Sequence, residues 1–261
     1  MTVLEKALKF IAGWQIETPK YFGVFHISWL SAAFVSCVLI CLFGRRISAR
    51  AVDIALIIWG VLLIFAEAVK QALCSVSFTD GNAVWSYAWW AFPFQYCSVP
   101  LYFAIPAGAL KKGWVKSVLC TYLATFAMLG GIFASFFPAN MFSTSGFLSV
   151  HTMFWHTTMV VAGVALWAAG AVKTDFKVML GAICVFAALV LAALVLNITV
   201  YETLGDVGFN MFFISPYEPF DVPIIKHIYG AITYYGYLPL YILTVTAASV
   251  GLYFAARRFS R

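Results

Sequence analysis

Charged side chains are scarce in this sequence. Asp, Glu, Lys and Arg make up 10% of its 261 residues, whereas 64% are hydrophobic and the mean hydropathy is +0.94. A soluble domain cannot bury that much apolar surface, but a chain with several apolar runs of about 20 residues can place it in a bilayer. The runs also lack the short alternating segments of a membrane β-barrel. The composition therefore predicts an all-α, polytopic membrane protein.

The first 20 residues lack the apolar core of a cleavable signal peptide, because charges occur throughout "MTVLEKALKFIAGWQIETPK". Residues 3–15 are instead predicted to form a short amphipathic helix on the membrane surface. No linker, low-complexity tract or internal repeat divides the rest of the chain. The predicted organisation is an amphipathic segment at 1–20, a transmembrane domain at 21–256 and a basic tail at 257–261.

Seven apolar runs predict seven membrane spans, at 21–43, 51–73, 87–110, 114–137, 148–172, 177–200 and 230–256. Lys and Arg are absent from two of the connections, 74–86 and 138–147, and the 201–229 connection has only Lys226 beside four acids. The remaining connections and the C-terminus are basic. Because basic loops stay in the cytoplasm, we expect the N-terminus outside and the C-terminus inside. This topology accounts for the formal charge of +6 without a nucleic-acid partner.

Polar side chains are few within the predicted spans, and they fall in the half of the bundle nearest the outer surface. They are His26, Glu67, Lys70, Gln71, Gln95, Cys97, His151, His156, Asn197 and Glu202. Ionisable groups at such depth are costly and usually mark a functional interior. The pattern predicts a polar cavity inside the bundle, open toward the outer leaflet. The 201–229 connection is expected either to cover this end as a lid or to be an ordinary loop.

Cys97 and His156 are predicted to lie at similar depths on different spans. A thiol becomes a useful nucleophile when a neighbouring base takes its proton, and a histidine can be that base. Pro100 is predicted to bend the third span near the thiol and to expose backbone groups that a tetrahedral intermediate could use. The alternative is an inert, buried cysteine, as expected for the other five cysteines, which suggest no disulfide framework.

Glu67, Lys70 and Gln71 share one face of a predicted helix. They form either a support for substrate or an ion pair that satisfies only itself. His151 and His156 are separated by five positions, which is about 140° around a helix, so they cannot chelate one metal as histidines at i and i+4 do. We expect no metal site and no cofactor. His151 is expected to bind headgroups or to lie at the interface.

Three segments, "FPFQYCSVPLYFAIP", "FWHTTMVVAGV" and "LNITVYETLGDVGFN", followed by "YYGYLPLYIL", resemble in their order and spacing the YwaF / transmembrane protein 164 family. The likeness extends from about residue 20 to 255, although Gln95 stands where a histidine is expected in many relatives. The resemblance implies a seven-helix membrane fold and an acyltransferase that remodels phospholipids through an acyl-cysteine. The family's cysteine maps onto Cys97 and its histidine onto His156.

Three functions are consistent with these features. The first is an acyltransferase with membrane lipids as partners, in which His156 activates Cys97 and later the acceptor, while Gln95, Asn197 or Lys70 orients a headgroup or oxyanion. The second is a proton-coupled transporter based on Glu67, Lys70 and the histidines, although the expected inverted repeats are absent. The third is a non-catalytic seven-helix membrane protein. Compact loops suit a bacterial inner membrane, and no feature specifies an oligomeric state.

Overall fold

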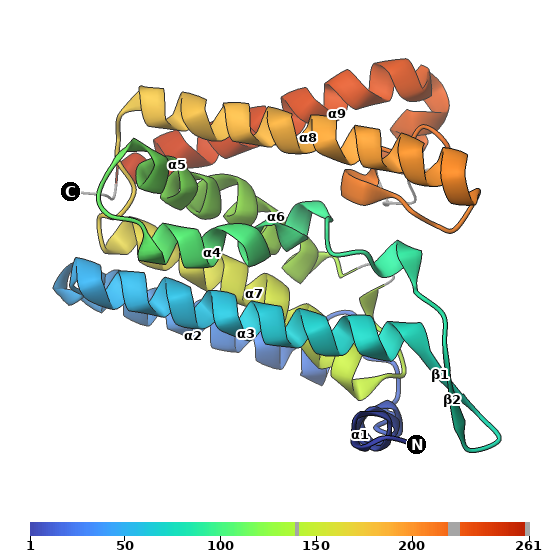
Figure 1. Ribbon diagram of the computed structural model, residues 1–261. Coiled ribbons are helices and arrows are strands. Elements are labelled where there is room, and N and C mark those ends of the chain that lie inside the picture. Colours follow the sequence, from blue (N-terminus) through green and yellow to red (C-terminus); the bar gives the residue numbers. More distant parts are fainter. Residues whose placement is uncertain (139–140, 219–224, 259–261) are drawn as a thin grey trace.

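The computed structural model describes residues 1–138, 141–218 and 225–258. Long helices lie side by side along one axis, and a two-stranded antiparallel hairpin of β1 (Val76–Thr79) and β2 (Asn82–Trp85) projects from one end (Figure 1). The predicted class, a helical bundle of membrane type, is confirmed.

The helices follow the apolar runs of the sequence. Their bounds are α1 (Val3–Ala12), α2 (Val24–Phe43), α3 (Ala49–Ser75), α4 (Val99–Ala109), α5 (Trp114–Tyr122), α6 (Met128–Phe136), α7 (Gly146–Ala168), α8 (Phe176–Leu204) and α9 (Ile225–Arg257). Within the described residues, five helical stretches are long and apolar enough to cross a membrane. These are Val24–Arg46, Ala49–Ser75, Trp114–Phe136, Phe176–Leu204 and Ile232–Arg257.

The third predicted span, 87–110, is helical only in its second half. Two short 3-10 turns, η2 (Trp89–Ala91) and η3 (Tyr96–Ser98), and extended residues precede α4, which begins at Val99. Pro100 therefore lies in the first turn of α4, where a missing N–H leaves no hydrogen bond unmade. The prediction that Pro100 bends a continuous helix is wrong. Cys97 therefore lies in the short 3-10 turn η3, just before α4 begins, and not within a long α-helix.

A π-helical turn, η4 (Leu123–Ala127), joins α5 to α6 in the middle of the bundle, and all of its residues are buried. Such a turn changes the usual helical pairing, and buried carbonyls must still find donors. Two aromatic side chains supply them: Tyr96 O–H donates to the Phe126 carbonyl at 2.5 Å, and Trp167 Nε1 donates to the Ala124 carbonyl at 2.9 Å. The turn thereby fixes Tyr96, the residue next to Cys97.

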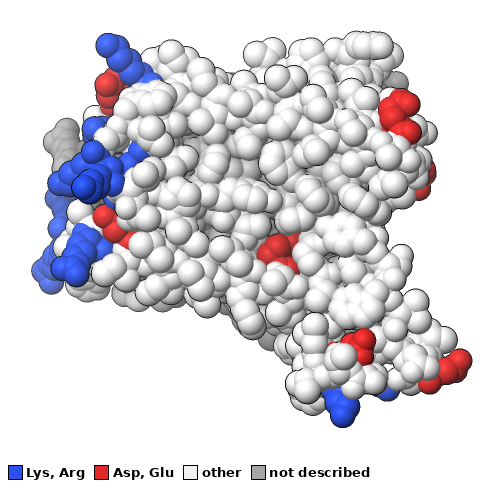
Figure 2. All heavy atoms as spheres, viewed as in Figure 1, with Lys and Arg blue, Asp and Glu red and all other residues white. Residues whose placement is uncertain are grey.

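Positive charges gather at one end of the bundle, which we call the basic end (Figure 2). This end contains the connections from α2 to α3, from α4 to α5 and from α7 to α8, together with the end of α9 (Figure 1). Its basic residues are Arg45, Arg46, Arg50, Lys111, Lys112, Lys116, Lys173, Lys177, Arg257 and Arg258. A broad zone that is mostly uncharged, with one acidic patch near its middle, separates the basic end from the hairpin end (Figure 2). The charge distribution is thus strongly one-sided along the helix axis.

Helix α1 lies at the hairpin end and is closed by a capping box. The Thr2 side chain accepts from the Glu5 backbone at 3.2 Å, and the Glu5 carboxylate accepts from the Thr2 backbone at 2.6 Å. The bond from the Thr2 backbone holds the pKa of Glu5 below its usual value. Val3, Leu4 and Phe10 are exposed. The helix therefore has the apolar surface expected of a segment that lies on a membrane.

Candidate functional site

The backbone around Cys97 is anchored to α7. Trp155 is buried on α7, and its indole Nε1 donates to the Cys97 carbonyl at 2.8 Å. The preceding residue, Tyr96, is held by the Phe126 carbonyl of η4. The Cys97 side chain itself is half-buried and forms no disulfide. Two independent hydrogen bonds therefore fix where this thiol enters the bundle.

Two adjacent glycines of α6 bring the thiol segment and α7 close to the same helical turn. A Cβ atom on Gly130 would lie 2.6 Å from a ring carbon of Tyr96, and one on Gly131 would lie 2.8 Å from the His156 carbonyl oxygen. Real Cβ atoms do not approach so closely, so both neighbours rest on bare backbone. Tyr96, the neighbour of Cys97, and His156 thus both pack against the same turn of α6.

His156 is buried, and its hydrogen bonds define its tautomer. Nδ1 lies 2.8 Å from the Thr152 carbonyl, which can only accept, so Nδ1 carries the proton of the neutral ring. Nε2 is then the basic nitrogen, and it has no hydrogen-bond partner among the described residues, Cys97 included. An imidazole held through Nδ1–H with a free Nε2 has the arrangement of a general base.

A polar cluster on α3 lies beside this pair. Glu67 Oε1 accepts from Lys70 Nζ at 2.8 Å and from Gln71 Nε2 at 2.7 Å, and Tyr87 O–H donates to Gln71 Oε1 at 2.9 Å. Only 6% of the Glu67 side chain is exposed, so its charge depends on these partners. The predicted sharing of one helix face is confirmed for Glu67, Lys70 and Gln71.

His151 connects the α3 cluster to the thiol segment. Its ring stacks on Trp155 with centroids 5.1 Å apart, and Trp155 in turn holds Cys97. His151 Nε2 lies 3.9 Å from Glu67 Oε2, which is too long for a hydrogen bond, and it has no such partner in the described part of the chain. The side chain is 9% exposed. Nε2 of His151 is thus a buried polar atom that faces the Glu67 carboxylate without a hydrogen bond to it.

Gln95 and Asn197 both bind one segment of the connection between α8 and α9, which we call the strap (residues 209–215). Gln95 donates to the Asn210 carbonyl at 2.9 Å and accepts from the Phe212 N–H at 3.1 Å. Asn197 donates to the Met211 carbonyl at 3.0 Å and accepts from the Met211 N–H at 2.7 Å. Each amide therefore pairs with strap backbone in the way a neighbouring strand would.

The strap covers the thiol segment at the hairpin end. Phe212 is fully buried, with its ring 5.7 Å from that of Tyr96 and 5.8 Å from that of Phe94. Phe212 and Phe213 both have φ of 56°, in the left-handed region that non-glycine residues rarely adopt. Such strain persists only where surrounding contacts impose it. Most residues of the strap are thus buried, although Phe213 is exposed, and residues 219–224 of the predicted lid lie outside the described residues.

The family model of the TMEM164 family matches residues 21–255 of this chain. The chain belongs to the TMEM164 family. The resemblance inferred from the sequence motifs is confirmed, and the chain is an integral membrane protein. The matched region includes the thiol segment, both α7 histidines, the α3 cluster and the strap. No curated protein and no solved structure matches the chain at the similarity required.

In this TMEM164-family chain, the remaining predicted polar residues have structural partners. His26 is buried; its Nδ1 accepts from the Phe22 N–H at 3.0 Å and its Nε2 donates to the Ser135 carbonyl at 2.7 Å. Tyr217 O–H donates to Glu202 at 2.9 Å, which raises the pKa of that phenol. Among the described residues, His, Cys, Asp and Glu form no cluster of three or more that could hold a metal.

Sequence reasoning missed two parts of this TMEM164-family site. Trp155 stood inside the family-like segment "FWHTTMVVAGV" but was given no role, although an indole in a polar core needs an acceptor and could have been matched with the irregular backbone near Cys97. The strap belongs to the 201–229 connection, for which a lid and an ordinary loop were both expected, although the apolar run "FNMFFI" at 209–214 is typical of a buried segment and favours the lid.

Proposed function

We propose that this protein is a membrane acyltransferase that acts on phospholipids or lysophospholipids through an acyl-cysteine. The observation that supports this most is the buried His156, whose Nε2 lone pair is free because Nδ1 donates to Thr152. Cys97 is half-buried, and the residue before it, Tyr96, packs against the same turn of α6 as His156. The sulfur and Nε2 form a hydrogen bond once substrate closes the site, as catalytic pairs commonly do.

The proposed reaction has two half-reactions. The Cys97 proton passes to His156 Nε2, and the thiolate attacks the ester carbonyl carbon of a donor phospholipid. The ester C–O bond breaks, the departing lysolipid oxygen takes the proton from His156, and an acyl thioester remains on Cys97. In the second half-reaction, the hydroxyl oxygen of an acceptor attacks the thioester, the C–S bond breaks, and the hydroxyl proton ends on the sulfur. Atoms and charge balance without a metal or redox cofactor.

The remaining polar residues support this site. Gln95 and Asn197 hold the strap over the thiol segment, since their amide groups are paired with its backbone. Glu67, Lys70 and His151 form the polar wall on the other side. The apolar outer surface of the bundle suits lipid substrates, which diffuse to the protein within the bilayer.

The proposed topology has seven spans, with the N-terminus outside and the C-terminus inside, in the cell membrane of a bacterium. We expect Asp80→Cys, in the hairpin, to react with a membrane-impermeant maleimide added to intact cells, because the basic end is retained in the cytoplasm. Lys112→Cys, in the connection from α4 to α5, should react only after the cells are opened. Labelling of Lys112→Cys in intact cells would show that the orientation is reversed.

The acyl-cysteine itself is directly testable. We expect purified protein in liposomes with labelled donor phospholipid to carry one labelled acyl group, on the peptide that contains Cys97. Because thioesters are cleaved by neutral hydroxylamine and ordinary esters are not, the label should leave on hydroxylamine treatment. Mass spectrometry of the digested protein measures both properties.

A matched control uses another free cysteine in the apolar zone. Cys184 on α8 is exposed, and Cys184→Ala should keep both the label and its sensitivity to hydroxylamine. Label on Cys184, or none on any cysteine with a range of acyl donors, would contradict the proposed reaction.

A proton-coupled transporter is the second candidate, and the buried Glu67–Lys70 pair beside His151 is the observation that favours it. This function predicts substrate-dependent proton uptake in proteoliposomes that Glu67→Gln abolishes and Cys97→Ala leaves intact. The acyltransferase predicts the opposite dependence for Cys97.

A further inference from the structure

The backbone carbonyl of Cys97 lacks the donor that its own 3-10 turn would offer. Cys97 lies in η3, and a 3-10 turn pairs the carbonyl of residue i with the N–H of residue i+3. For Cys97 that residue is Pro100, which has no N–H. An unpaired carbonyl inside the bundle is costly, so a donor from another element stabilises this turn.

Trp155 of α7 supplies that donor. Its indole Nε1 donates to the Cys97 carbonyl at 2.8 Å, and only 3% of the residue is exposed. The ring of His151 stacks on the indole with centroids 5.1 Å apart. The Trp155 carbonyl accepts from Thr158 Oγ1, which in turn accepts from Trp59 Nε1 of α3, each at 3.0 Å. Trp155 is thus held at its ring and at its backbone while it holds Cys97.

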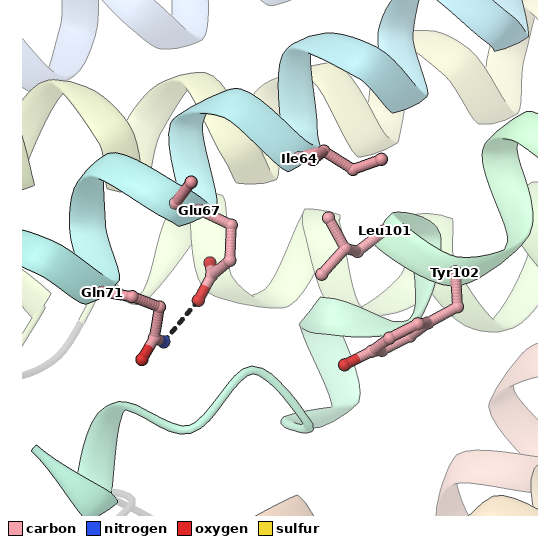
Figure 3. Close-up of a pocket in the computed structure, with 6 residues that line it drawn as sticks. Ile64, Glu67, Gln71, Leu101 and Tyr102 are labelled. Carbon is pink, nitrogen blue, oxygen red and sulfur yellow. Dashed lines mark hydrogen bonds between the residues drawn. The ribbon is translucent and has the colours of Figure 1, made fainter. Parts of the chain in front are cut away.

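On the side of α3, the first turns of α4 border a cavity. It has a volume of about 350 Å³, and Leu101 and Tyr102 of α4 face Glu67 and Gln71 of α3 across it (Figure 3). The side chains of α3 therefore do not close against the beginning of α4 at this level. The segment that precedes α4 depends correspondingly more on its contacts with α7 and η4.

The residue that holds Cys97 and the proposed base are neighbours in the sequence. Trp155 and His156 both lie on α7, where consecutive side chains point about 100° apart. Nδ1 of His156 is fixed by the Thr152 carbonyl of the same helix, at 2.8 Å. The bond from Trp155 therefore fixes the position of Cys97 relative to the helical turn that carries the imidazole.

We infer that Trp155 is a positioning residue for the acyl transfer. Its indole N–H holds the backbone of Cys97 where the sulfur can reach Nε2 of His156, and the stacked His151 ring limits the tilt of the indole. A shift of about 1 Å between reacting groups can lower a rate about 100-fold, so such a bond has a large effect without touching substrate. The inference rests on the proposed function, for which it names the residue that sets the distance between nucleophile and base.

Trp155→Phe tests this inference, because phenylalanine keeps a ring for the stack with His151 but has no N–H. In proteoliposomes with labelled donor phospholipid, the variant should form acyl-Cys97 about 10–100-fold more slowly at saturating donor. The donor concentration that gives half of the maximal rate should stay unchanged, because the bond does not contact the donor.

Trp167→Phe is the matched control. Trp167 is a buried indole on the same helix, about 18 Å further along it, and it donates to the Ala124 carbonyl at 2.9 Å. The two variants lose the same kind of hydrogen bond, so their thermal unfolding midpoints should fall by similar amounts. Trp167→Phe should nevertheless form acyl-Cys97 at the normal rate.

A rescue variant separates the hydrogen bond from the volume of the indole. Pro100→Ala restores an N–H three positions after Cys97, so Trp155→Phe combined with Pro100→Ala should recover part of the rate. If Trp155→Phe does not fold, benzothienylalanine in place of Trp155 keeps the bicyclic shape without the N–H and should slow the reaction to the same degree. A normal rate without the N–H, an equal loss of rate in Trp167→Phe, or no recovery in the combined variant would overturn the inference.

Alkylation of the thiol separates this inference from the proposed function. The rate at which iodoacetamide modifies Cys97 near neutral pH reports how well His156 takes up its proton, whether or not the protein transfers acyl groups. Trp155→Phe, His156→Gln and their combination should lower this rate by about the same factor, because each breaks one sulfur–imidazole contact. This pattern in a protein that forms no acyl-Cys97 would refute the proposed function and keep the positioning role of Trp155. Effects that multiply, or an unchanged rate in either single variant, overturn the inference.

Discussion

Acyl transfer is expected to fall to the rate measured without protein when Cys97 is replaced by alanine, and by about 10²–10⁴-fold when His156 is replaced by glutamine. Alanine removes the sulfur that would carry the acyl group, so no covalent intermediate can form. Glutamine places a polar amide near the position of Nε2, but an amide cannot act as a base at neutral pH. Transfer of labelled acyl chains between lipids in proteoliposomes measures both effects.

The controls distinguish lost chemistry from lost structure. Cys184→Ala should keep the full rate, and the thermal unfolding midpoints of Cys97→Ala and His156→Gln should stay close to that of the unmodified protein. His156→Gln should slow the formation of acyl-Cys97. Normal formation of acyl-Cys97 in His156→Gln would remove His156 from the reaction while leaving Cys97 in place.

Replacing Asn197 by leucine is expected to lower the free energy of unfolding by about 2–6 kcal/mol. The Asn197 amide pairs with both the N–H and the carbonyl of Met211, and both residues are fully buried. Leucine has a similar volume but no polar atoms, so two buried backbone groups lose their partners, at about 1–3 kcal/mol each. The thermal unfolding midpoint in detergent should fall by several degrees or more.

Two further substitutions on α8 calibrate this result. Thr203 is exposed, and among the described residues its side chain bonds to the Thr199 carbonyl of its own helix alone, so Thr203→Val should change the stability by no more than about 0.5 kcal/mol. Asn197→Asp keeps the acceptor for the Met211 N–H and loses the donor, so its effect should be smaller than that of leucine. An Asn197→Leu variant as stable as Thr203→Val would mean that the strap is not held by this amide.

The helical class could be predicted because long apolar runs have few other solutions in a membrane. The third run could not be resolved, because hydropathy averages over about 20 residues and does not separate a helix from irregular apolar backbone. Local chemistry contained part of the answer: Pro93 and Pro100 flank Cys97, and a proline favours the start of a helix over its interior. The start of α4 at Val99 agrees with that preference.

The sequence indicates the level of the site residues along the helices, but it does not indicate the directions in which their side chains point. Counting residues from the span ends placed Cys97 and His156 at similar levels, yet the rotation of each helix depends on packing between distant segments. The tautomer of His156 follows from Thr152 on the same helix, which a helical reading of α7 permits. Gln95 and Asn197 are expected from the sequence to orient a headgroup or oxyanion, but the sequence could not reveal that their amides pair with the backbone of the strap.

The π-helical turn η4 limits which changes in length the chain can accept between α5 and α6. Its position between α5 and α6 sets the rotation of Gly130 and Gly131, the two residues on which Tyr96 and the His156 backbone rest. Removing one residue from 123–127 would narrow the turn and rotate everything after it by about 100°. Both glycines would then turn away from Tyr96 and from the His156 backbone. The number of residues in 123–127 therefore determines how closely the Cys97 segment and His156 approach each other.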